Sequence, residues 1–320
     1  MQKLVLDDVK WNLKKINNDV PGLLNSFIAG LTHSLRHAGR DADFIWLMGV
    51  SGFAFRIIIN AQMCLSGPTS FLWKDLLPES IEQAGYSGLH IYDGWDDNIL
   101  SEKRGEARNE IEKALKQNIL PVVWEIELAE WGLITGFDDA SAEYTVVSIF
   151  DNTIKIAYDV FGRNKDIGGL SVSIPGRPNS RSRREIINNS LKMASAHAKQ
   201  KEWCERPSSQ DGLPAYDLWA SIVERGEGLD IVWYSAGQYY SARCCAYRYL
   251  RQEADGNELL LEAAAAYNEV AELLGAIWEE FLPGKKTNRD KCPQMSEIIR
   301  KAGKIEAKAI DLIDAYLESL

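Results

Sequence analysis

Histidine and cysteine are scarce in this sequence, and each shortage removes a class of site. Four histidines occur in 320 residues, and none belongs to an HExxH pattern, which would bring two zinc ligands onto one helix face. His33 and His37 share a face of a predicted helix, where a half-buried surface is a better interpretation than a metal pair. The five cysteines are odd in number and scattered, so they form neither a disulfide framework nor a CxxC motif. We therefore expect no metal and no cofactor.

Long apolar runs and the glycine patterns of nucleotide cradles are also missing. No run approaches the roughly 18 residues that span a bilayer, and the opening MQKLVLDDVK lacks the order of a signal peptide. The glycines fit no GxGxxG, Walker or GxSxG pattern. A formal charge of −10 repels the phosphates of nucleic acids. We expect a soluble, cytoplasmic protein that binds no nucleic acid and inserts into no membrane.

Hydrophobic residues make up 46% of the chain, which is enough to bury a large core. Their spacing predicts helices over 22–39, 78–83 and 101–117, with extended segments at 44–50, 53–60 and 89–92. The segments 121–124, 131–137, 144–150, 154–158 and 170–174 then read as mostly antiparallel strands. Helices followed by such a run of strands favour an α+β domain over a doubly wound one.

The segment 175–180 holds two prolines, a glycine and polar residues, which predicts a domain boundary. We expect an α+β domain over residues 1–175 and a mostly helical bundle over residues 181–320. His197, on the first helix after the boundary, is expected at the surface. The last helix carries apolar residues at three- and four-residue steps, at Ile298, Ala302, Ile305, Ala309, Leu312 and Tyr316. Such a face packs inside a bundle, and a homodimer seam is the alternative.

The stretch 121–139 holds two short strands around a corner rich in tryptophan and glutamate, and it predicts the floor of a pocket. Glu125 and Glu127 face the same way if the first strand continues. Glu130 is the carboxylate that we expect in the pocket wall, because a buried carboxylate needs a partner and is often functional. Side chains that point to solvent are the alternative for all three.

Three segments carry a resemblance to a known family. Ser26 to Gly39 is a predicted helix that ends in glycine thirteen residues after its start, Glu130 to Asp139 reads EWGLITGFDD, and Met48 to Arg56 is a turn with two glycines. Together they resemble the papain-like C39 peptidase superfamily, in the branch named for the N-terminal domain of the butirosin acyltransferase BtrH. There a cysteine nucleophile begins the helix, and a histidine opens a strand of the form HxVxxxGYDD. The resemblance implies a papain-like (cysteine-peptidase-like) N-terminal domain.

Three positions depart from the pattern of that superfamily. Ser26 stands where the superfamily has its cysteine, Glu130 where it has its histidine, and Val20 where it has a glutamine. Thiolate attack needs a sulfur of low pKa, a basic imidazole and oxyanion donors. A serine hydroxyl without an imidazole is a poor nucleophile at neutral pH. The catalytic residues are therefore unknown, and we expect no working peptidase.

Our first hypothesis is a catalytically inactive papain-like protein that binds a small molecule or peptide in a cleft at the start of the first helix. Its polar anchors are Ser26, Arg56 and Glu130. Its aromatic walls, for which core packing is the alternative, are Trp46, Phe53, Phe55, Trp124 and Trp131. The second hypothesis is an acyltransferase or amide hydrolase of the BtrH type, acting in peptide or natural-product biosynthesis with Glu130 as base.

Overall fold

The structure is a computed structural model of the whole chain. It describes residues 2–6, 9, 11, 19–94, 97–124, 129–163, 169–202, 208–285 and 289–320, with the backbone alone over 97–100. The chain divides into two compact units, each built from segments that are far apart in sequence. Unit 1 comprises Met1–Asp19, Ser26–Leu47 and Leu72–Arg181, and unit 2 comprises Val20–Asn25, Met48–Phe71 and Ser182–Leu320.

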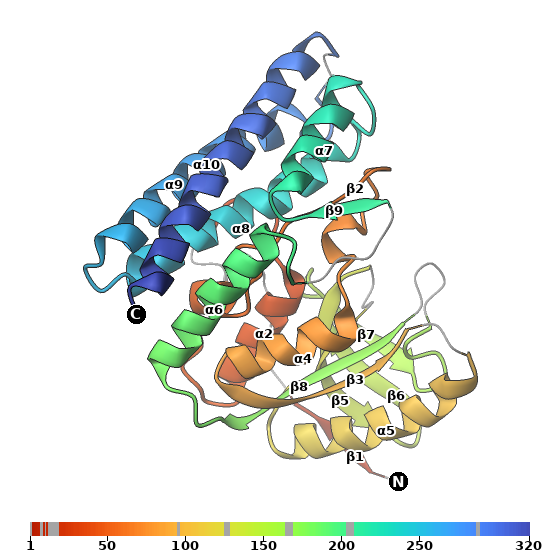
Figure 1. Cartoon of the computed structure of the whole chain (residues 1–320). Coiled ribbons are helices and arrows are strands. Elements are labelled where there is room, and N and C mark those ends of the chain that lie inside the picture. Colours follow the sequence, from red (N-terminus) through yellow and green to blue (C-terminus); the bar gives the residue numbers. More distant parts are fainter. Residues whose placement is uncertain are drawn as a thin grey trace. The chain divides into compact units, whose positions relative to one another are not determined.

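Unit 1 is an antiparallel sheet with helices packed on it. Its strands are β1 (Lys3–Val5), β3 (Tyr86–Asp93), β4 (Val122–Trp124), β5 (Trp131–Asp138), β6 (Glu143–Val147), β7 (Thr153–Ala157) and β8 (Leu170–Pro178). The strand order is β3-β8-β4-β5-β6-β7, and β1 pairs with β5. Helix α2 (Ser26–His37) packs on β4 and β5, while α4 (Trp73–Gln83) and α5 (Asp97–Lys116) pack on β3 and β8 (Figure 1). Helix α3 (Phe44–Val50) contributes residues to both units.

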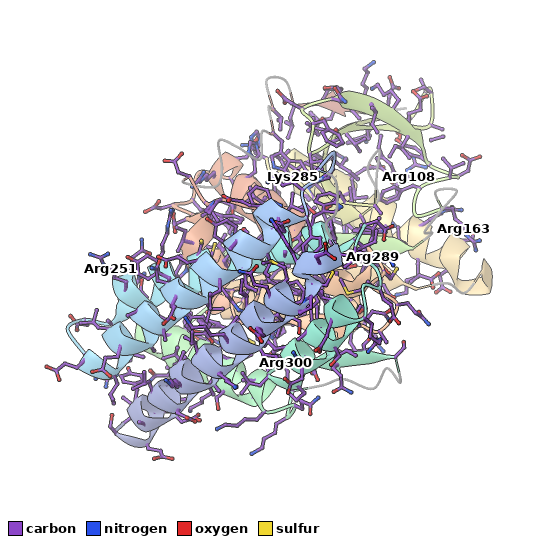
Figure 2. The ribbon with its side chains drawn as sticks, turned by 90° about the horizontal axis from the view of Figure 1, so that it is seen from above. Arg108, Arg163, Arg251, Lys285, Arg289 and Arg300 are labelled. Carbon is purple, nitrogen blue, oxygen red and sulfur yellow. The ribbon has the colours of Figure 1, made fainter. Side chains whose placement is uncertain are left out.

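Unit 2 is mostly helical. It holds α6 (Arg183–Ala198), α7 (Pro214–Glu224), α8 (Val232–Glu253), α9 (Glu258–Glu280) and α10 (Cys292–Glu318), with 3-10 turns η1 (Gly67–Thr69) and η2 (Arg289–Lys291). A short antiparallel pair, β2 (Ile58–Asn60) with β9 (Ser209–Asp211), completes it. Helices α8, α9 and α10 lie side by side (Figure 1). Figure 2 shows Arg300 on α10 beside α7, which carries the partner carboxylate Glu224.

A buried ion pair ties the helices of unit 2 to an earlier segment of the chain. Arg243 on α8 donates to both carboxylate oxygens of Glu306 on α10, at 2.7 and 2.8 Å. Its remaining nitrogen donates to the carbonyl oxygens of Arg56, at 2.9 Å, and Ala54, at 3.2 Å. Both charged side chains are almost fully buried, so loss of one partner would leave an uncompensated charge in the core.

The predicted fold class is confirmed at the level of a mixed α+β chain with an antiparallel sheet and a helical C-terminal region. Helix accounts for 53% and strand for 16% of the chain. The extended segment expected at 44–50 is wrong, because these residues form α3. Residues 53–55 form a turn rather than a strand. No described helix is long and apolar enough to cross a membrane.

Candidate functional site

Helix α2 begins at Ser26 and lies close against the middle of the unit 1 sheet. Gly30 makes this approach possible, because a Cβ at that position would lie 2.9 Å from Val122 Cγ1 on β4. Val122 pairs with Leu133 on β5, so the first turns of α2 cover the junction of these two strands. The sheet therefore holds the N-terminal end of the helix in a fixed place beside the start of β5.

The side chains of Ser26 and Glu130 meet at that end, although 104 positions separate them in sequence. The hydroxyl Oγ of Ser26 donates a hydrogen bond to Oε2 of Glu130. The backbone N–H of Trp131 donates to the same hydroxyl, at 3.3 Å. Ser26 is 3% exposed, whereas Glu130 is half-buried. The hydroxyl is thus enclosed and engaged as both donor and acceptor.

Three tryptophans form one cluster next to this pair. The ring centroid of Trp131 lies 4.3 Å from that of Trp124 and 4.9 Å from that of Trp73, the first residue of α4. Trp73 also lies 4.6 Å from Trp124 and 6.2 Å from Tyr92 on β3. Phe27, which follows Ser26, meets the edge of Trp131 at 5.8 Å. Trp131 therefore contacts the cluster through its ring and Ser26 through its backbone.

The strand register explains why these rings gather on one face. Tyr92 pairs with Ser171, and Trp124 pairs with Trp131. Strands β4 and β8 pair at Val122 and Ser173, and two residues further along this ladder Trp124 is level with Ser171. Tyr92, Ser171, Trp124 and Trp131 therefore form a row across four neighbouring strands. It lies on the face that carries Val122, which α2 covers.

Two polar atoms of this row are buried without a hydrogen-bond partner among the described residues. They are Nε1 of Trp131 and Oγ of Ser171, on side chains that are 3% and 2% exposed. Buried polar groups without partners are few in folded proteins. Tyr92, at one end of the row, and Trp73, which contacts Tyr92, Trp124 and Trp131, are half-buried and so remain partly open to solvent.

The histidines of unit 1 are not placed to act as an acid or base for Ser26. Nδ1 of His90 and Oγ of Ser173 form a hydrogen bond of 2.8 Å. Burial lowers the pKa of His90 to about 4. Burial, together with the charges of His37 and Arg36, also lowers the pKa of His33 to about 4. His37 bonds to Asn118 at the far end of α2. The base within reach of the Ser26 hydroxyl is the carboxylate of Glu130.

The other residues predicted for the cleft belong to other elements of the structure. Trp46 is half-buried on α3. Phe55 belongs to the core of unit 2, where its ring packs edge-on against Tyr249 and Tyr267. Val20, which the resemblance matched to a glutamine, is buried in unit 2. Glu125 and Glu127 lie outside the described residues.

Phe53 and Arg56 line a small pocket within unit 2. Its walls are mainly apolar and are formed by Asn25, Met48, Phe53, Arg56, Ile57, Ile58, Pro68, Phe71, Gln238, Tyr239 and Ala242. The cavity measures about 40 Å³, whereas pockets for drug-sized ligands usually measure roughly 300–1,000 Å³. Arg56 is also occupied, because it donates to Glu202 and to the carbonyl oxygen of Ser51. As it stands this pocket has room for water and not for a larger ligand.

His197 is fully buried, so the prediction that it lies at the surface is wrong. Its Nε2 accepts from the backbone N–H of Ile57 at 2.9 Å, which leaves the proton on Nδ1 to be donated to Glu202, also at 2.9 Å. Burial alone would raise the pKa of Glu202, but the charge of Arg56 and the hydrogen bonds from His197 and Arg56 lower it to about 2. This arrangement holds the segment around Ile57 in place and leaves His197 no free lone pair for catalysis.

Sequence reasoning did not find Trp73, Tyr92 and Ser171. The helix that carries Trp73 was expected to begin at residue 78, because Pro78 favours a helix start. In the structure Pro78 lies inside α4. The alternation of His90 and Tyr92 along β3 was the available signal for Tyr92, since both fall on the same face of a strand.

Comparison of the chain with protein-family models and with curated proteins finds no match to either. Within the described residues, no three His, Cys, Asp or Glu side chains are grouped closely enough to hold a metal ion. The chemistry of the site therefore has to be argued from its own residues.

Proposed function

We propose that this protein binds a small molecule or peptide at the Ser26–Glu130 site of a papain-like unit and does not cleave it. The observation that carries the proposal is the state of the Ser26 hydroxyl. It is 3% exposed, it donates to Glu130, and it accepts from the Trp131 backbone. A nucleophile has to reach a carbonyl carbon. The Ser26 hydroxyl is buried, and both of its hydrogen bonds are made within the protein.

The weak basicity of a carboxylate also favours binding over cleavage. A general base works best when its pKa lies near the operating pH, and imidazole meets that condition without any perturbation. A carboxylate has an ordinary pKa near 4, so it withdraws a proton from a serine hydroxyl far less readily. The pair therefore suits holding a ligand better than attacking one.

The surroundings of the pair have the composition of a ligand site. Such sites combine aromatic walls with a few convergent polar groups. Here the walls are Trp73, Trp124, Trp131 and Tyr92. The polar groups are Glu130 and Nε1 of Trp131, which has no hydrogen-bond partner among the described residues. Trp124 and Trp131 are members of the ligand-binding set predicted from the sequence. Trp46, Phe53, Phe55 and Arg56 are not needed for this site.

The second candidate is an acyltransferase or amide hydrolase in which Ser26 is the nucleophile. One observation favours it: the Ser26 hydroxyl donates directly to the Glu130 carboxylate, which is the contact that general-base activation requires. In this mechanism the substrate would have to break the hydrogen bond from the Trp131 N–H to Ser26 Oγ. That N–H would then have to donate to the developing oxyanion instead.

A serine-directed fluorophosphonate probe separates the two candidates. A nucleophilic Ser26 would be labelled, and intact-mass spectrometry would show one adduct that is absent from Ser26→Ala. We expect no adduct on the wild-type protein after prolonged exposure. Labelling at Ser26, or ester turnover that is lost in both Ser26→Ala and Glu130→Gln, would establish the enzyme instead.

Binding is tested with protein in which the ten tryptophans carry 5-fluorotryptophan. Substitution of Trp73, Trp124 and Trp131 by Phe, one at a time, assigns their fluorine resonances. A set of amino-acid amides, dipeptide amides and small polar fragments is then screened. We expect hits to shift these three resonances and to bind more weakly to Glu130→Gln. Hits confined to other tryptophans, or an absence of hits, would refute the proposal.

A further inference from the structure

We propose that the outer face of helices α8 and α9 is the contact surface of a homodimer, in which two copies of the chain pack with their α8 helices antiparallel. This inference concerns a partner and is independent of the ligand proposed for the Ser26–Glu130 site. Both helices belong to unit 2. The argument uses the composition of this face, the order of its side chains and the position of its charges.

Helix α8 is apolar on its outer side as well as on its buried side. Val232, Ala236 and Tyr239 face the hydrophobic core of unit 2. From Val232 to Ala242 the sequence holds no charged residue, and two residues of this stretch, Trp233 and Tyr240, are only half-buried. A helix that is apolar on all sides is normally covered on all sides. The outer side of α8 therefore lacks the charged residues of a helix face that remains in water.

This outer side continues onto the neighbouring helix α9, and the two rows together are called the α8–α9 face. Its side chains recur at helical spacing and are half-buried or exposed. They are Trp233, Tyr240, Cys244, Tyr247 and Arg251 on α8, and Leu261, Ala265, Asn268, Glu272, Ala276 and Glu279 on α9.

Contacts between the helices show that the two rows adjoin. The ring of Tyr240 lies 6.0 Å from that of Trp278 on α9, and a Cβ at Gly275 would lie 2.9 Å from the Tyr240 ring. Burial, followed by the nearby Cys244, Glu279 and Glu272, raises the pKa of Tyr240. The aromatic row of α8 and the acidic part of α9 therefore form one continuous surface.

The α8–α9 face has the size and composition of a protein–protein contact. Such contacts are enriched in Tyr, Trp and Arg. Leu261, which is 41% exposed, adds an aliphatic side chain to the aromatic ones. The two helices contain 22 and 23 residues. Side by side they offer roughly 33 Å by 20 Å, or about 650 Å² on each copy. Two copies would bury about 1,300 Å² in total, which exceeds the ~1,000 Å² expected of a specific interface.

The order of side chains along α8 suits a second copy related by a two-fold axis. Trp233 and Arg251 lie at equal distances from Ala242 along the helix, and so do Tyr240 and Cys244. An axis at the level of Ala242 therefore brings Trp233 level with Arg251 of the partner subunit. It also brings the large Tyr240 level with the small Cys244 of the partner subunit. The first pair allows a cation–π contact, and the second lets the helices approach closely.

The charges of the face favour the same antiparallel order. Figure 2 shows Arg251 at the surface near the C-terminal end of α8. A Cβ at Gly237 would lie 2.8 Å from Trp278, so Glu279 lies between the levels of Trp233 and Tyr240. The two-fold axis then places Arg251 of the partner subunit within about one helical turn of Glu279. Parallel α8 helices would instead bring the two copies of Arg251 together, which is unfavourable.

Charge reversal tests this arrangement, because Arg251 and Glu279 are exposed and can be replaced without disturbing the core. Sedimentation velocity of the full chain at micromolar concentration should give twice the mass of one chain. At low ionic strength, Arg251→Glu and Glu279→Arg should each raise the dissociation constant at least about tenfold, since each brings like charges together at two places. The double variant should restore the affinity of the wild type.

Two matched variants control for the change in net charge. Lys304→Glu and Glu297→Arg alter exposed residues of α10, outside the α8–α9 face, and should leave the dissociation constant unchanged. The circular dichroism spectrum of each variant checks that it is folded.

A disulfide provides a second measurement of the pairing. The thiol introduced by Tyr240→Cys should form a disulfide with Cys244 of the partner subunit under mild oxidation. A disulfide within one chain is excluded, because Cβ atoms four residues apart on a helix are about 5–6 Å apart and a disulfide needs about 3.5–4.5 Å. The linked dimer should be absent when Cys244→Ser is added.

Each result decides for or against the proposed dimer. A chain that sediments as a monomer throughout the micromolar range overturns it. A dimer that neither charge reversal weakens uses another surface, and this also overturns it. If the double variant does not recover, or if no disulfide depends on Cys244, the two α8 helices are not paired antiparallel and the proposal fails.

Discussion

At the scale of single residues, the Ser26–Glu130 pair carries its charge differently from a cysteine–histidine pair. In an activated cysteine–histidine pair the negative charge lies on the nucleophile and a positive charge lies on the imidazole. In the Ser26–Glu130 pair a neutral hydroxyl donates to a carboxylate. A pair of this kind has no positive member to stabilise an anionic intermediate. It retains an acceptor that can hold a positively charged or hydrogen-bond-donating ligand.

The burial of His90 predicts how stability depends on pH. Burial lowers its pKa from 6.5 to about 4, so between these values the unfolded chain binds a proton that the folded chain does not. The contribution is therefore fully present above pH 6.5 and is lost as the pH falls toward 4. His33, with a pKa of about 4, acts in the same direction.

Urea unfolding at pH 7 and pH 5 measures this effect. We expect His90→Gln to lose about 1–2 kcal/mol less stability than the wild type over this interval. Part of the wild-type dependence should persist in the variant because His33 remains. Identical losses in the two proteins would show that folding does not lower the pKa of His90.

At the scale of secondary-structure elements, two helical glycines can be compared, one packed against the sheet and one exposed. Gly30 on α2 faces Val122, and an added Cβ would lie 2.9 Å from Val122 Cγ1. Val122 is fully buried and β-branched, so its methyl group cannot easily move away. Gly105 on α5 is exposed, and a Cβ there would meet nothing within 4 Å.

The two alanine substitutions should therefore change stability in opposite directions. Gly105→Ala should stabilise the protein by about 0.5–1 kcal/mol, because alanine restricts the unfolded chain and favours the helix. Gly30→Ala gains the same helix propensity, but overpacking costs about 1–3 kcal/mol, so the net effect is destabilising. Denaturant midpoints of both variants and the wild type give the comparison. Stabilisation by Gly30→Ala would mean that α2 can move off the sheet.

Element prediction from the sequence succeeded where the apolar pattern has a clear period. The helix α5 and the strand β5 have such a pattern, and they occur within a few residues of their predicted bounds, 101–117 and 131–137. The run from Phe44 to Val50 is buried at nearly every position, so it shows neither a helical nor a strand period. Asp43 was the informative residue, since its carboxylate accepts from the backbone N–H of Trp46 at 2.8 Å, as helix caps do.

The site required information of another kind. A family pattern, and not periodicity, predicted that Ser26 and Glu130 belong to one site, because no local signal links residues 104 positions apart. The contact of Trp73 with Trp124 and Trp131 was not predicted at all. It depends on where α4 starts and on the pairing of β4 with β5, and both are settled by tertiary packing.

At the scale of the whole molecule, composition predicted a single boundary at residues 175–180, whereas two earlier segments of the chain also belong to unit 2. Unit 2 includes Val20–Asn25 and Met48–Phe71 in addition to everything from Ser182 onward. The reason lies in specific long-range bonds. Strand β2 pairs with β9, and Arg243 donates to the carbonyl oxygens of Ala54 and Arg56. Such bonds leave no trace in the composition of a linker.

This arrangement predicts that a fragment of residues 182–320 does not fold by itself into the structure of unit 2. Without the segment 48–71, β9 loses its partner strand and the buried Arg243 loses two of its acceptors. The apolar side chains of Ile57 and Ile59 also leave the core. Unsatisfied buried polar groups cost about 1–3 kcal/mol each, which is a large share of the usual stability of a domain.

We expect this fragment to show a helical circular dichroism spectrum without a cooperative thermal transition. Co-expression with residues 1–181 should restore that transition. A fragment of residues 182–320 that melts cooperatively at the temperature of the full chain would instead show that the helices alone form a complete domain.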